Sequence, residues 1–285
     1  MGRADGDDRA DAVVSYLSSR ARRQREQPVG LDPPTDEGSA PHTPAGSPGA
    51  AVTLTDVRVW RRNDPTPTLA TGISLRVAPG QSVALYGPAD ATAVELLDAI
   101  VGRRRVRHGQ VTVHGTAHRL GVPASERCRG DRWLQSGRFP LLPSRSVTSN
   151  MVTALRARRP DATARARIAE LLVITGAAHL AARRVDTLSA EQQWRILIAR
   201  AMLNEPQLVA ADDPSPGLDS RAAAHVLDLL MDAQARFAFT LLLATRRLAT
   251  AARCDRVVGL VDGQVTMDEL IDDDAWTRGR VDRIG

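Results

Sequence analysis

The sequence contains no lysine. All 38 of its basic residues are arginines, in a chain of 285 residues with a formal net charge of +5. A genome biased toward Arg, Ala, Gly and Val codons is the simplest explanation of this composition. Whatever its cause, the absence of lysine means that no side-chain ammonium can bind a phosphate group. The planar guanidinium of arginine is not a substitute for the compact charge of an ammonium in a tight phosphate-binding loop.

Aromatic residues, cysteines and long apolar runs are also scarce. Aromatics make up 3% of the chain and the arginines are interleaved with acids, which argues against nucleic-acid binding. The two cysteines, Cys128 and Cys254, are too few for a disulfide framework or a zinc site. No apolar run approaches about 18 residues, and the N-terminus lacks the pattern of a secretory leader, so we expect no membrane span.

The composition changes along the chain and predicts three segments. Residues 1–50 form an N-terminal arm that combines a short amphipathic stretch, a basic run and a flexible linker rich in Pro and Gly. Residues 51–275 form the globular domain, and residues 276–285 form a C-terminal tail. The amphipathic stretch is compatible with a solvated helix or with docking on a partner or an anionic membrane surface.

Apolar strands alternate with helices in the globular domain, which predicts an α/β fold with a mainly parallel sheet. Strands are expected at 52–60, 72–77, 81–87, 110–115, 207–213, 239–245 and around an Asp262-Gly263 hairpin turn. Helices are expected within 147–186 and over 189–203 and 221–235.

The stretch YGPADATAVELL, from Tyr86 to Leu97, lies where a phosphate-binding loop should lie, after one apolar strand and before an apolar helix. A working loop of this kind reads G-x-x-x-x-G-K-[ST]. Here Thr92, Ala93 and Val94 stand in place of Gly, Lys and Ser/Thr. Thr92 and Glu95 also have the spacing of a capping box, a common device at helix starts, which would satisfy the N–H groups that a phosphate otherwise binds.

Several further motifs follow in order, and together they resemble the ATP-binding cassette of ABC transporters from about Val52 to Leu270. WLQSGRFPLLP resembles the Q-loop of that family, and LSAEQQWRILIARAMLNEPQLVAADDPSPGLD resembles its signature, helix, carboxylate-ended strand and D-loop. TLLLATRRLATAARCDRVVGLVDGQV resembles the switch-histidine strand and the last hairpin. The resemblance implies a P-loop NTPase-like cassette: a mainly parallel core sheet, an antiparallel β subdomain and a helical subdomain.

The resemblance also implies roles for individual residues. Asp213 stands in place of the catalytic glutamate, and Arg246 in place of the switch histidine. Gln135 and Asp212 match the residues associated with Mg²⁺. The nucleotide-binding positions are Trp60, Gly87, Pro88, Ala89, Asp90, Ala91, Thr92, Ala93 and Val94. The signature positions, which close over the nucleotide of a second cassette, are Leu188, Ser189, Ala190, Glu191 and Gln192.

The family's cofactors are ATP and Mg²⁺, but the residues that replace its lysine, Mg²⁺ hydroxyl, glutamate and histidine oppose binding and hydrolysis here. We therefore expect a degenerate ATP-binding subunit that acts with a membrane subunit and a second cassette, in a homo- or heterodimer. Its expected location is cytoplasmic, peripheral on the inner face of the cell membrane. Two alternatives stay open: a non-catalytic scaffold built on the cassette fold, and a slow ATPase that uses Asp212, Asp213 and Arg246 in new roles.

Overall fold

The computed structural model describes residues 50–60, 68–87, 92–104, 106, 108–117, 132–134, 141–155 and 160–271. The arm expected over residues 1–50 lies outside this part of the chain except for its last residue, and the tail lies wholly outside it. Pro88 to Ala91, Gln135 and the side chain of Trp60 also lie outside it.

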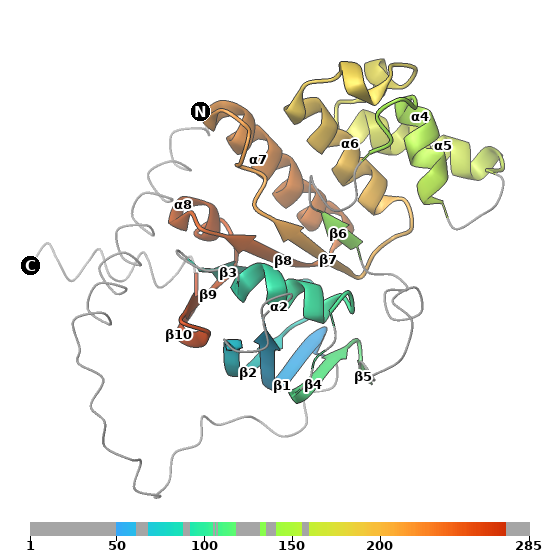
Figure 1. Ribbon diagram of the computed structural model, residues 1–285. Helices are drawn as coiled ribbons and strands as arrows, with labels where there is room; N and C mark the ends of the chain where they lie inside the picture. The colour runs from blue at the N-terminus through green and yellow to red at the C-terminus, as the bar shows by residue number, and fades with distance from the viewer. Residues whose placement is uncertain are drawn as a thin grey trace, which may run out of the picture.

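A six-stranded sheet forms the centre of the described structure, in the order β10-β9-β3-β8-β7-β6 (Figure 1). All neighbouring strands are parallel except the β9–β10 pair, which is antiparallel. The strands are β3 (Ser82–Tyr86), β6 (Arg132–Leu134), β7 (Leu208–Asp212), β8 (Thr240–Thr245), β9 (Arg256–Val261) and β10 (Gln264–Leu270). β8 is buried along its whole length, as expected of an inner strand that is covered on both faces.

A second, antiparallel sheet of four strands lies beside the first, in the order β2-β1-β4-β5. Its strands are β1 (Val52–Trp60), β2 (Thr68–Val77), β4 (His108–Val113) and β5 (Thr116–Ala117). Helix α2 (Thr92–Ile100) shares one apolar core with both sheets, because Leu96 and Ile100 pack in the same cluster as Val52 of β1 and Leu85 of β3. Figure 1 shows α2 between the two sheets.

The remaining helices form a second core on the other side of the six-stranded sheet, and α4, α5 and α6 gather away from the four-stranded sheet (Figure 1). The α-helices are α4 (Val147–Ala154), α5 (Ala162–Ile174), α6 (Ala190–Met202), α7 (Ser220–Phe237) and α8 (Leu248–Ala251). Two 3₁₀ turns, η1 (Ala178–Leu180) and η2 (Val185–Thr187), connect α5 to α6.

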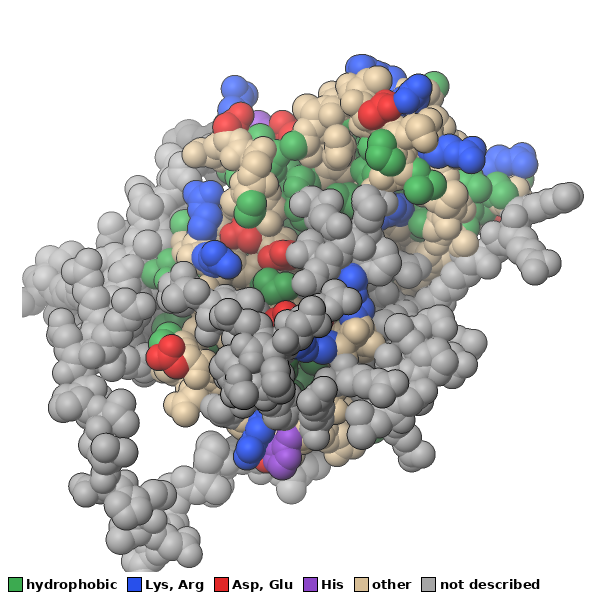
Figure 2. All heavy atoms as spheres, in the orientation of Figure 1, with side chains coloured by type: hydrophobic (Ala, Val, Ile, Leu, Met, Phe, Trp, Pro, Cys, Tyr) green, Lys and Arg blue, Asp and Glu red, His purple; other side chains and the backbone are tan. Residues whose placement is uncertain are grey.

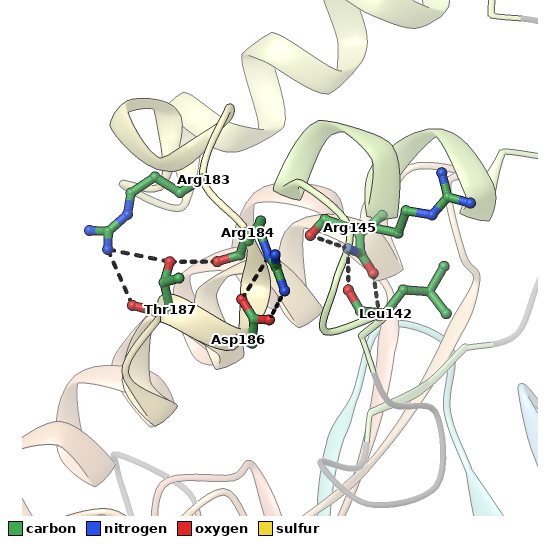
Figure 3. A network of polar contacts seen from close by, with 7 residues as sticks. Leu142, Arg145, Arg183, Arg184, Asp186 and Thr187 are labelled. Carbon is green, nitrogen blue, oxygen red and sulfur yellow. Dashed lines mark hydrogen bonds and ion pairs between the residues drawn. The ribbon is translucent and has the colours of Figure 1, made fainter.

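Asn150 of α4 fastens the loop before α4 to the rest of the helical part. Its side chain is fully buried, accepts a hydrogen bond from the Leu142 N–H at 2.6 Å and donates to the carbonyls of Leu142 and Ser146. The Val185 N–H donates to the Arg145 carbonyl at 3.1 Å, which ties the same loop to the turn before α6. Figure 3 shows Leu142 and Arg145 close to Arg184 and Asp186 of that turn.

The predicted architecture is confirmed: a mainly parallel core sheet, an antiparallel β subdomain and a helical subdomain. The expected hairpin after residue 255 is β9–β10, and its turn residues Asp262 and Gly263 have φ of 48° and 76°. Positive φ at both residues is typical of a two-residue hairpin turn. The expected helix start at Ser189 is also present, since Ser189 is the N-cap of α6.

Candidate functional site

Three parallel strands bring the family motifs to one edge of the core sheet. β3, β8 and β7 are neighbours, with Tyr86 opposite Thr245 and Asp212 opposite Ala244. Gly87 directly follows β3, and its N–H donates to the Thr245 carbonyl at 3.2 Å. Because the carboxyl ends of parallel strands meet at one edge, Gly87, Asp213 and Arg246 lie at the same end of the sheet.

Asp213, the residue at the catalytic glutamate position, accepts hydrogen bonds from two residues at this edge of the sheet. One carboxylate oxygen accepts a hydrogen bond from the Ser215 N–H at 2.8 Å, and the other accepts from the Thr245 hydroxyl. The Thr245 oxygen in turn accepts from the Arg247 N–H at 3.0 Å. Thr245 is 4% exposed, so a buried hydroxyl connects the ends of β7 and β8 through the Asp213 carboxylate.

The two residues after β8 are both cations. Arg246, at the switch-histidine position, is exposed, and so is Arg247. Asp212 is half-buried at the end of β7, and one of its oxygens accepts from the Asp213 N–H at 3.0 Å. Within the described residues no group of three or more His, Cys, Asp or Glu side chains is arranged to hold a metal ion.

Helix α2 carries a carboxylate of its own near its start. Glu95 lies in the first turn of α2, is buried and forms an ion pair with the Arg104 guanidinium. Both side chains are largely buried, at 18% exposure for Arg104 and 10% for Glu95. A carboxylate in the first turn of a helix interacts favourably with the positive end of the helix dipole, which is where a phosphate would bind.

The capping box predicted at Thr92 and Glu95 takes a different form. Thr92 is itself helical in α2 and is therefore not the residue before the helix. The partner that the structure gives to the Glu95 carboxylate is Arg104, nine residues further along the chain. The sequence predicted a role for Glu95 at the helix start, but not its pairing with Arg104, and no local sequence pattern links these two positions.

The residues at the lysine and hydroxyl positions are apolar and packed. Ala93 is 5% exposed and belongs to the core that α2 shares with the sheets, and the half-buried Val94 packs against that core. Neither side chain offers a charge or an oxygen to a ligand. Pro88 to Ala91, Gln135 and the side chain of Trp60 lie outside the described structure and are not placed in this geometry.

The signature segment forms the N-terminus of α6. The Ser189 hydroxyl accepts from the Gln192 N–H at 3.2 Å, and the Gln192 side-chain oxygen accepts from the Ser189 N–H at 3.0 Å, which makes a complete capping box. The carboxylate of Glu191 accepts from Arg195 one turn further on, at 2.7 Å, and is 3.7 Å from His225 of α7. Leu188 is buried, while Ser189 and Ala190 are exposed.

Two residues that the sequence analysis did not name make the contacts that hold Asp213 and Glu95. Ser215 supplies the N–H that holds Asp213, and Arg104 supplies the cation that holds Glu95. Ser215 has a local signal, because Asp, Asn and Ser often bind backbone N–H groups two residues on. Arg104 has none.

A family model described as "ABC transporter" matches residues 70–216 of the chain. This match begins in β2 and ends in the loop after β7, so it contains the phosphate-loop, signature and carboxylate positions. Within the described residues no helix has both the length and the apolar character needed to cross a bilayer.

Curated relatives and solved structures agree with this match. The chain is 37% identical over 207 residues to the lipoprotein-releasing system ATP-binding protein LolD of Anaeromyxobacter dehalogenans, covering 71% of this chain and 86% of the relative. It is 30% identical over 262 residues to the aliphatic sulfonates import ATP-binding protein SsuB of Cupriavidus necator, covering 91% and 78%. A dimeric ATP-binding cassette in a post-hydrolysis state, bound to ADP and Pi, has the same fold, with a TM-score of 0.67 at 22% identity over 78% of this chain and 99% of that one.

Proposed function

Because the chain belongs to the ABC transporter family of ATP-binding proteins, we propose that it is a degenerate ATP-binding subunit. In this proposal it pairs with a second, competent cassette and with a separate membrane subunit, on the cytoplasmic face of the cell membrane. The relatives' names cover both release and import systems, so the proposal names no transported substrate.

The observation that carries the proposal is the ion pair between Glu95 and Arg104. Glu95 is buried in the first turn of α2 and places a negative charge at the helix end that would bind a phosphate. Arg104 neutralises this carboxylate, so the pair already occupies the helix end, and no lysine is available to draw a phosphate into its place. The helix end is thus stabilised without a nucleotide, and the residues present do not fit MgATP.

The hydrogen bonds of Asp213 support the proposal that hydrolysis at the chain's own site is weak or absent. A carboxylate that activates water must place one of its oxygens within hydrogen-bond reach of that water. Here the Ser215 N–H holds one oxygen and the buried Thr245 hydroxyl holds the other, so the carboxylate is fixed at the strand ends and only its remaining lone pairs are left for a water. Aspartate is also about one methylene shorter than the glutamate of the family, and a misplacement of about 1 Å can cost roughly 10²-fold in rate.

The N-terminus of α6 retains two of the signature positions that would meet a partner's nucleotide, while Ala190 and Glu191 stand in place of the signature's two glycines. Ser189 and Gln192 are retained and order the first turn through their capping box. Glu191 is neutralised by Arg195 along the same helix, so its charge is directed away from the exposed Ser189. An ordered helix N-terminus with free backbone N–H groups is a suitable anion-binding end.

The test is nucleotide binding by the purified full chain, followed by association with a candidate cassette partner encoded nearby. We expect no saturable binding of MgATP to the chain alone by titration calorimetry. We expect ATP-dependent association with the partner by analytical ultracentrifugation, together with hydrolysis by the mixture. Saturable binding of MgATP by the chain alone at micromolar affinity would overturn the account of the α2 end.

A signature variant separates this function from that of a scaffold without nucleotide. Ser189→Arg places a bulky cation at the start of α6 and should abolish ATP-dependent association. Ser220→Arg is the matched control, because Ser220 is an exposed serine at the start of α7. Association that is independent of ATP and unaffected by Ser189→Arg would instead support a scaffold that uses the fold alone.

A further inference from the structure

A cavity lies at the opposite edge of the core sheet from the family motifs. Its volume is about 570 Å³, within the range of roughly 300–1,000 Å³ that is typical of small-molecule sites. Gly80 before β3, Gln207 before β7 and Thr240 at the start of β8 line it, so it lies at the amino-terminal ends of these three parallel strands. The ends of α6 and α7 complete its wall through Met202 and Phe237.

Two guanidinium groups flank one aromatic ring in this cavity. The Arg167 Cζ lies 5.3 Å from the centre of the Phe237 ring, and the Arg236 Cζ lies 5.9 Å from it. Arg167 comes from α5, and Arg236 from the last turn of α7. Two like charges gathered around one ring repel each other, so a bound anion would lower the energy of this arrangement.

The hydrogen-bonding capacity of these arginines is largely unused within the described residues. Arg167 donates one terminal N–H to Glu170 at 2.9 Å, but its Nε is buried and has no partner there. Arg236 forms neither a hydrogen bond nor an ion pair with the part of the chain that the structure describes. Buried donors are normally satisfied, and an unused guanidinium fork matches a carboxylate or a phosphate.

The other lining side chains give the cavity an apolar side. Met202, Phe237, Pro79 and Pro206 contribute apolar surface next to the two guanidinium groups. The imidazole of His114 also lines the cavity. Burial lowers the pKa of His114, which favours its neutral form, so it adds no further positive charge at pH 7. Glu205 also lines the cavity and sets a limit on how much negative charge a ligand can carry.

We propose that this cavity binds a small organic anion, a carboxylate or phosphate monoester attached to a flat apolar group. The anion pairs with Arg167 and Arg236, and the apolar group packs against Phe237 and Met202. The site differs from the nucleotide motifs, which lie at the carboxyl ends of the same three strands. Each of these strands has five or six residues, so about 15–20 Å of buried sheet separates the two edges.

The experiment titrates the full chain with phenyl phosphate by calorimetry and follows the Met202 methyl signal by NMR. We expect one saturable site, a shift of the Met202 signal, and weaker binding of benzyl alcohol, which has the ring without the charge. Removing one charge-assisted contact should weaken phenyl phosphate binding about ten- to a hundredfold in Arg236→Gln and in Arg167→Gln.

Arg221→Gln is the matched control, because Arg221 is exposed in the first turn of the helix that carries Arg236 and does not line the cavity. It should leave the affinity within about twofold of the unmodified chain, as expected for a surface residue away from the site. The absence of saturable phenyl phosphate binding would overturn the proposal. Equal weakening in Arg221→Gln, or equal affinity for benzyl alcohol, would also overturn it. Arg236 is exposed, so its variant keeps the test valid even if Arg167→Gln disturbs the packing of α5.

Discussion

The hydroxyl of Thr245 connects the two strand ends that carry the catalytic positions. It donates to the Asp213 carboxylate of the β7 end and accepts from the Arg247 N–H after β8. A bond to a charged acceptor in a buried position contributes more than a typical neutral bond, and leaving such an acceptor unsatisfied costs about 1–3 kcal/mol.

Thr245→Val should therefore lower the free energy of unfolding by about 1–3 kcal/mol, because valine keeps the shape of threonine and removes its hydroxyl. Urea unfolding followed by circular dichroism measures this change. Thr250→Val is the control, since Thr250 is also buried but its side chain has no hydrogen bond within the described residues. Equal effects of the two substitutions would show that the bond to Asp213 contributes nothing.

A second prediction concerns the ion pair between Glu95 and Arg104. Arg104→Met leaves a largely buried carboxylate without its cation, and breaking a buried pair in this way costs about 3 kcal/mol. The double variant Glu95→Gln, Arg104→Met removes the charge as well and should recover part of that loss. Thermal and urea unfolding of the two variants measure the difference.

The exposed pair between Arg253 and Asp228 provides the comparison for this prediction. Its side chains are 39% and 49% exposed, so Arg253→Met should cost less than about 1 kcal/mol. A double variant at Glu95 and Arg104 that is no more stable than Arg104→Met alone would contradict the account of α2. The helix end would then not depend on the compensation of charge.

At the scale of elements, helix α7 ends in a residue that favours glycine. Ala238 adopts φ 52° and ψ 29°, and its N–H donates to the Gln234 carbonyl at 2.8 Å. A side chain in this left-handed conformation costs about 1–2 kcal/mol, which glycine avoids at the expense of greater freedom in the unfolded chain.

Ala238→Gly should therefore raise the free energy of unfolding by up to about 1 kcal/mol. Ala235→Gly, three residues earlier on the exposed side of the same helix, should lower it by about 0.5–1 kcal/mol. The opposite signs are the result to check, by urea unfolding of both variants. A loss of stability in both would show that the left-handed conformation of Ala238 costs little.

Most of these elements could be predicted from the sequence because their signals are local. Alternation of apolar residues predicts β1, and serine with glutamine three residues later predicts the start of α6. The Asp262-Gly263 pair predicts the turn between β9 and β10. The order of the family motifs then predicts the sheet on which the candidate site is built.

The contacts that distinguish this candidate site could not be predicted in the same way. Arg104 lies beyond the end of α2, where no helical period relates it to Glu95. Thr245 and Asp213 are 32 residues apart and meet only because β7 and β8 pair in one particular register. The cavity depends on the packing of α5, α6 and α7 against three strand ends, and no sequence pattern encodes it.

At the scale of the whole molecule, the core sheet separates two chemically different edges. The carboxyl edge carries carboxylates held by Thr245 and Arg104, and the amino edge carries arginines whose donors are largely unused within the part of the chain that the structure describes. Figure 2 shows acidic and basic side chains interspersed on the face in view, so the described surface there does not divide into halves of opposite charge. The two edges therefore differ through local pairing and not through the overall charge.

The stability of the whole molecule should also depend on pH through one buried thiol. Burial raises the pKa of Cys254 from 9.0 to about 12, and Asp255 beside it adds to this effect while Arg253 opposes it. Because the pKa is higher in the folded chain, stability is unaffected below about pH 9, where the thiol is protonated in both states. Between pH 9 and 12 the unfolded chain loses the proton first, so the free energy of unfolding falls as pH rises.

The comparison that isolates this thiol is unfolding of the unmodified chain and of Cys254→Ala at pH 8 and pH 10. The alanine variant loses packing at every pH, but it cannot lose the proton. The stability advantage of the unmodified chain should therefore shrink by about 1.4 kcal/mol between the two pH values. Other groups titrate equally in both proteins and cancel. An advantage that stays constant from pH 8 to pH 10 would mean that the thiol ionises as easily in the fold as outside it, and that water reaches the core between α8 and β9.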